Sequence, residues 1–69
     1  MNRTPVSSTS IAEIGYDEQS QTLEVQFRRG GIYQYFDVTP GVYEQLMAAP
    51  SMGQFVAEQV KGRYRYARL

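Results

Sequence analysis

The sequence predicts an α+β domain, in which a three-stranded antiparallel β-meander is followed by two short α-helices packed on one face of the sheet. Apolar and polar side chains alternate from residue 12 to residue 38, as is typical of half-buried strands. A Thr-Pro pair then begins a stretch with helical spacing, and a second helix start follows Pro50. With 69 residues and no cysteine, the chain has room for one small core and cannot form a disulfide.

The first two strands follow from this alternation. Polar or small residues separate the apolar ones in both segments, and residues 17–21 between them favour a turn. The buried faces are expected to carry Ala12, Ile14 and Tyr16 in the first strand and Leu23, Val25 and Phe27 in the second.

A glycine-containing turn leads into the third strand, expected over Ile32–Val38. The turn sequence Arg28–Gly31 ends in two glycines, which adopt positive φ angles at little cost. Because side chains alternate along a strand, the number of turn residues decides which face of the third strand is buried.

Two registers are open at this turn. A two-residue turn pairs Phe27 with Ile32 and directs Tyr33 and Tyr35 to the opposite face, near Glu24. A three-residue turn reverses the faces and makes both tyrosines core residues. We expect the two-residue turn, because it gathers more purely apolar side chains on the buried face.

Two helices follow. Thr39 is the expected N-cap and Pro40 the first helical residue of the first helix, which Pro50 ends. Ser51–Gln54 resembles a capping box for the second helix, and Gly62 is expected to stop it. The remaining terminal segment could add a further strand. Apolar residues at helical spacing are Val42, Leu46 and Ala49, then Phe55, Val56 and Val60.

The ends and the composition limit the function classes. Residues 1–7 are expected to be a flexible lead-in and 8–69 a single domain, without a signal peptide or membrane span, in the cytoplasm. Without histidine or cysteine, no metal site or cofactor is expected. Asp17, Glu24 and Asp37 have no spacing that commits them to one pocket, so we expect no enzyme.

Several short motifs occur in an order that resembles the KTSC domain, named for the C-terminus of some lysyl-tRNA synthetases. The resemblance covers roughly Ser8 to Tyr64. It implies a small free-standing bacterial member of that family, for which the synthetase association suggests RNA binding. Because no catalytic motif is present, we expect an uncharacterised noncatalytic binding module whose partner could be RNA or tRNA. The motifs are Ser8, Ile11, Ile14–Asp17, the Leu23/Val25/Phe27 strand, Tyr33-Gln34-Tyr35, Val38-Thr39-Pro40 and Ala49–Phe55.

An RNA-binding hypothesis places Tyr33 and Tyr35 as base-stacking rings on an open sheet face. The segment Lys61–Leu69 contains four basic residues and no acidic residue, whereas the rest of the chain is net negative. The predicted phosphate contacts are Arg28, Arg29, Arg63, Arg65 and Arg68. If the three-residue turn formed, the stacking platform would be lost and only the basic tail would remain.

Two alternatives compete with RNA binding. The tyrosines can be packing residues whose rings cover the sheet while their hydroxyls stay wet. A protein–protein interaction module could instead use an exposed Tyr33/Tyr35 face or an edge strand, because interfaces are enriched in aromatic residues and arginine.

Overall fold

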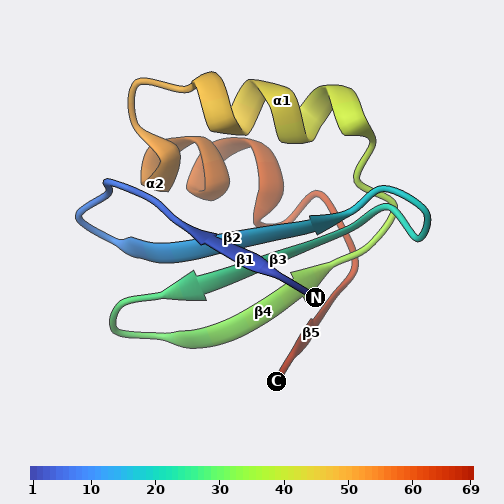
Figure 1. The fold of residues 1–69 in the computed structure, drawn as a ribbon, viewed down its shortest axis with the longest axis horizontal. Helices are drawn as coiled ribbons and strands as arrows, with labels where there is room; N and C mark the ends of the chain where they lie inside the picture. Colours follow the sequence, from blue (N-terminus) through green and yellow to red (C-terminus); the bar gives the residue numbers. More distant parts are fainter.

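The computed structural model describes residues 1–69 as a five-stranded antiparallel sheet with helices on one face (Figure 1). The strands lie in the sheet in chain order, β1-β2-β3-β4-β5. The α+β class and the two helices on one face are confirmed, while the sheet has two strands more than the predicted meander. The elements are β1 (Arg3–Pro5), β2 (Ile11–Asp17), β3 (Thr22–Phe27), β4 (Gly31–Tyr35), α1 (Pro40–Ala48), α2 (Met52–Phe55), the π-helix η1 (Val56–Val60) and β5 (Tyr66–Arg68).

The two additional strands form the edges of the sheet. β5 pairs antiparallel with β4 and is the strand that the terminal segment was expected to add. β1 lies within residues 1–7, the expected flexible lead-in, and pairs antiparallel with β2. A three-residue strand is too short to show an alternating pattern, which is why the sequence does not predict β1.

A β-bulge shifts the buried face of β2. Ile11 pairs with Phe27 and Glu13 with Gln26, so Ala12 is the additional residue. Ile11 and Ile14 are therefore both fully buried, although a regular strand would place them on opposite faces. Ile11 takes the fully buried place that the alternation gave to Ala12, which is only half-buried.

The hairpin between β3 and β4 has the three-residue turn, so the predicted two-residue register is wrong. Phe27 pairs with Gly31, and Tyr33 lies opposite Val25. A two-residue type I′ turn would put a positive φ on Arg29 as well as on a glycine, which is costly for a residue with a Cβ. In the observed turn only Gly31 takes a positive φ, of 89°.

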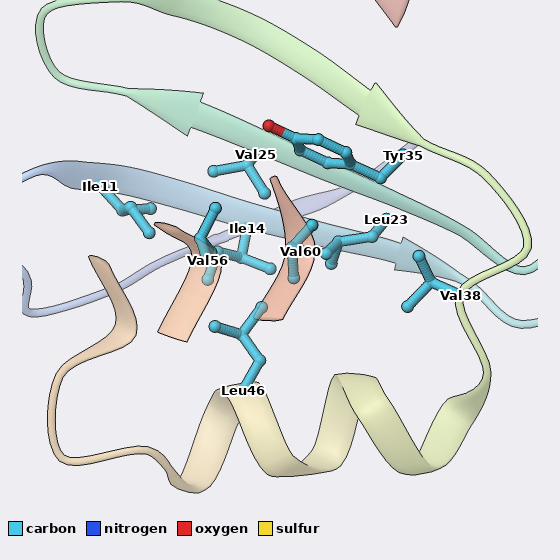
Figure 2. Packing of buried hydrophobic residues seen from close by; sticks show 9 residues of the cluster. All are labelled: Ile11, Ile14, Leu23, Val25, Tyr35, Val38, Leu46, Val56 and Val60. Carbon is cyan, nitrogen blue, oxygen red and sulfur yellow. The ribbon is translucent and has the colours of Figure 1, made fainter. Parts of the chain in front are cut away.

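The core lies between the sheet and the helices (Figure 2). Leu46 of α1 points from the helix layer toward the sheet, and the η1 side chains lie between α1 and the strands. Tyr35 is 2% exposed, so the three-residue turn makes it a core residue. The buried cluster comprises Ile11, Ile14, Leu23, Val25, Tyr35, Val38, Leu46, Val56 and Val60.

The start of α1 is fixed to the sheet by Tyr16. Its hydroxyl donates to the carbonyl of Val38 over 2.5 Å, and its ring stacks on Tyr43 with the centroids 4.6 Å apart. Thr39 is the N-cap with extended backbone, as predicted, although its side chain makes no capping hydrogen bond. No helix in the structure has the length and apolar character needed to cross a membrane.

Candidate functional site

A groove of about 750 Å³ opens on the helix-covered face of the sheet, beside the region that the helices cover. The helices lie over β2 and β3, and β4 and β5 extend away from them (Figure 1). We call this feature the aromatic groove. Its lining residues are Thr9, Ser10, Phe27, Arg28, Arg29, Gly30, Tyr33, Tyr35, Lys61, Gly62 and Tyr66.

Aromatic rings from three strands form the floor of the aromatic groove. Tyr35 pairs with Tyr66 across β4 and β5, and their ring centroids are 6.2 Å apart. Tyr33 lies 5.8 Å from Tyr66 and 6.3 Å from Tyr35, nearly parallel to the latter. Phe27 meets the edge of Tyr33 at 5.7 Å. These separations are typical of interacting aromatic rings, so the floor is a continuous apolar surface.

The rings differ in accessibility. Tyr66 is 61% exposed, Tyr33 is half-buried, and Tyr35 is buried beneath them. Burial raises the pKa of Tyr35 above its ordinary value, and the neighbouring Tyr33 and Tyr66 raise it further. Tyr66 and Tyr33 are the rings that a ligand can reach.

Four cationic side chains surround this floor, and none of them pairs with a carboxylate. Arg28, Arg29 and Lys61 line the groove, and the Arg68 guanidinium lies 5.7 Å from the centre of the Tyr33 ring. The three salt bridges of the molecule involve only Arg3 and Arg65 among the basic residues. Since no acidic residue lines the groove, its positive charge is uncompensated.

The π-helix η1 places one of these cations. The amide of Lys61 donates to the Val56 carbonyl, five residues back, and Lys61 itself has extended backbone that ends the helix. Its ammonium lies 4.7 Å from the centre of the Phe27 ring, within the range of a cation–π contact. The end of η1 thus forms one wall of the groove.

The turn between β3 and β4 places the arginines. The Arg28 guanidinium donates to the Ser8 carbonyl over 2.9 Å, and this bond fixes it against the loop before β2. A Cβ on Gly31 would lie 3.3 Å from the Arg68 guanidinium, so the absence of a side chain lets Arg68 lie close against the turn. Arg68 therefore lies against the turn that carries Arg28 and Arg29.

Acidic groups lie on the opposite face of the sheet, which we call the open face. Glu24, whose side chain is 8% exposed, accepts from Arg3 at 3.2 Å and from Gln34 at 2.8 Å. Arg3 also pairs with Glu13 at 3.1 Å. The expectation that Glu24 shares one face with the tyrosines is wrong, because the three-residue turn separates them.

The structure brings together some of the predicted site residues. Tyr33, Tyr35, Arg28 and Arg29 line the aromatic groove, and Arg68 lies over Tyr33. The three-residue turn makes Tyr35 a core residue, as expected for that register, whereas Tyr33 stays half-buried and lines the groove.

The other two predicted residues lie outside the groove. Arg65 pairs with Asp37 at 2.9 Å, and Arg63 donates to the Glu58 carbonyl at 3.0 Å. Both line a shallow depression on the far side of Tyr66. RNA contacts of Arg63 and Arg65 stay a prediction, and they would require a ligand that extends past the groove.

Among the aromatic and cationic residues of the groove, the sequence reasoning missed Phe27, Lys61 and Tyr66. The signal for Tyr66 is its spacing of two from Arg68 in the terminal segment, which places both on one face of a strand. Phe27 was expected in the core. It packs against the core cluster and also lines the groove. The structure contains no group of three or more side chains suited to hold a metal ion.

The fold defines a small α+β protein with an aromatic groove on the helix-covered face of its sheet. A family model described as the KTSC domain matches residues 7–64. The chain therefore belongs to the KTSC domain family, as the resemblance predicted.

The relatives include small proteins and one domain of a larger enzyme. A protein of Tsukamurella paurometabola is 43% identical over 65 residues, covering 94% of this chain and 97% of the relative. A lysine–tRNA ligase of Nostoc punctiforme is 39% identical over 59 residues, which are 86% of this chain and 10% of the ligase. The crystal structure of a KTSC domain protein from Yersinia pestis matches with a TM-score of 0.96 and 40% identity, over 99% of this chain and 96% of that one.

Proposed function

We propose that this protein is a noncatalytic binding module that takes single-stranded RNA into the aromatic groove. One observation carries the proposal: four cations without a carboxylate partner surround a floor of aromatic rings. Bases stack on aromatic side chains, and phosphates pair with arginine and lysine. The groove offers both groups within one continuous surface.

The charge distribution supports an anionic ligand at this place. The formal net charge is zero, so attraction cannot come from the molecule as a whole. The glutamates of the open face are compensated by Arg3, while the groove cations are not. Local attraction for a phosphate backbone is therefore strongest at the groove. The occurrence of the domain in a lysine–tRNA ligase is consistent with RNA as the partner.

The proposal is tested by NMR titration of the labelled protein with single-stranded RNA and with tRNA, at several salt concentrations. Shift changes should be centred on the groove residues, and affinity should fall with salt because phosphate binding releases counterions. Each removed phosphate contact should lower the salt slope by about 0.7 for a single strand. Arg29→Ala tests this, with Arg65→Ala as the matched arginine outside the groove.

Stacking is tested separately at Tyr66, whose high exposure makes substitution safe for the fold. Tyr66→Ala should weaken binding by about 1 to 3 kcal/mol with little change in salt slope, whereas Tyr66→Phe, which keeps the ring, should bind nearly as well. Absence of shift changes in the groove at low salt, where attraction is least screened, would exclude RNA. The alternative, a protein-interaction module using an edge strand, would then be the better hypothesis.

A further inference from the structure

We infer that the aromatic groove holds a unit of about two nucleotides, with one base on Tyr66 and one on Tyr33 and the phosphate at the Arg68 end. This inference rests on the proposed function and adds the size of the ligand. It separates this domain from modules that hold long single-stranded tracts, whose sites take roughly 4 to 16 nucleotides for each OB fold.

The number of bases follows from the accessible rings. Stacking platforms hold about one base for each exposed ring. Tyr35 is only 2% exposed. A cation lies over both Phe27 and Tyr33, but the Lys61 ammonium is closer to its ring, at 4.7 Å, than the Arg68 guanidinium is to the Tyr33 ring, at 5.7 Å. Tyr66 and Tyr33 remain, with their centroids 5.8 Å apart.

The phosphate position follows from the cations next to these rings. Arg68 is exposed and lies against Gly31, at the turn that also carries Arg28 and Arg29. Its guanidinium contacts the Tyr33 ring in the free protein, and its exposed side chain has room to turn from that ring to a phosphate. A base stacked on Tyr33 would thus have its phosphate beside three arginines.

The length limit follows from what lies beyond the groove. Past Tyr66 the nearest cations are Arg63 and Arg65. Arg65 pairs with Asp37 at 2.9 Å and the Arg63 guanidinium donates to the Glu58 carbonyl at 3.0 Å, so both are already engaged within the protein. Beyond Arg28 the wall is the polar, uncharged segment 7–10. The volume of about 750 Å³ falls in the range of sites for small ligands, roughly 300 to 1,000 Å³.

A length series of uridylates at one fixed salt concentration tests the inference. The probes are uridine monophosphate, the 5′-phosphorylated dinucleotide, the tetramer and the octamer, followed by NMR shift changes at the groove. The dinucleotide should bind about 5 to 140 times more tightly than the monophosphate, which is one stacking increment expressed as a ratio. From the dinucleotide to the octamer, affinity corrected for the number of registers should change by less than about three-fold.

Variants distinguish the two sites within the groove. Tyr66→Ala should reduce dinucleotide affinity to the level of the monophosphate, Tyr66→Phe should restore it, and Arg65→Ala should leave it unchanged. Affinity that keeps rising with length after that correction would overturn the two-nucleotide unit and leave RNA binding intact. Equal binding of monophosphate and dinucleotide would also overturn it. Failure of every uridylate and of tRNA to bind would overturn the proposed function and the inference together.

Discussion

Replacing Gly31 with alanine should destabilise the protein, whereas the same replacement at the adjacent Gly30 should not. Gly31 has a φ of 89°, in the left-handed region, where a residue with a Cβ costs about 1 to 2 kcal/mol. Its Cβ would also lie 3.3 Å from Arg68, whose flexible end can move. At Gly30 a Cβ would be 3.5 Å from Phe27, which is ordinary contact, and φ is not positive.

The two variants have identical composition, so their comparison isolates the turn geometry. For a domain of this size, 1 kcal/mol corresponds to roughly 4 to 8 °C in Tm. Gly31→Ala should therefore lower Tm by about 4 to 16 °C. Gly30→Ala should leave Tm unchanged or raise it slightly, because alanine reduces the conformational freedom of the unfolded chain. Circular dichroism during thermal unfolding measures both.

The reverse ranking would refute the three-residue turn. In the two-residue register Gly30 is a central turn residue with positive φ, and alanine would be costly there instead. Equal, small effects at both positions would mean that the turn tolerates either residue and that its geometry does not fix the register. Contacts between the Tyr33 ring and the Val25 methyl groups, observed by nuclear Overhauser effects, give an independent check of the pairing.

Two further predictions concern stability. Arg3→Ala should lower the free energy of unfolding by about 1 to 3 kcal/mol in chemical denaturation, because Glu24 is nearly buried and loses its cation. As the control, Arg65→Ala breaks an exposed ion pair and should change the free energy of unfolding by less than about 1 kcal/mol. Equal effects of the two substitutions would contradict this reasoning. Tyr35 has a pKa raised above 10.0, chiefly by burial, so the unfolded chain loses that proton first. The protonated Tyr35 hydroxyl contributes fully to stability below about pH 10, and this contribution is lost as the pH rises through the folded-state pKa. Tyr35→Phe should therefore lose less stability at alkaline pH than the unchanged protein. An equal loss of stability in both proteins would count against burial of this hydroxyl.

The sequence predicts those elements whose signals are local. Thr39 with its extended backbone and Pro40 with its fixed φ mark the start of α1, and neither needs a tertiary contact. The Ser51 hydroxyl accepts from the Gln54 amide at 3.2 Å, as the capping box predicts, although the Gln54 side chain bonds Glu58 instead. Such motifs act within a few residues, and a single sequence therefore reveals them.

Other elements depend on partners distant in the chain. The Arg3–Pro5 strand has no pattern of its own and exists because β2 offers an edge and Glu24 offers a charge. The bulge at Ala12 depends on the pairing with β3. Lys61 reaches the Phe27 ring only because η1 ends as a π-turn. Period-two and helical patterns contain no information on these long-range choices.

The register of a single turn sets the chemistry of the proposed site. In an antiparallel sheet a shift of one residue moves every side chain of a strand to the other face. The two-residue turn would put Tyr33 and Tyr35 on the face of Glu24, where a carboxylate opposes an anionic ligand. The three-residue turn places them beside Phe27, on the face where Arg68 and Lys61 also lie. Since Gly31 permits this turn, the residue that fixes the hairpin also keeps acidic groups out of the groove.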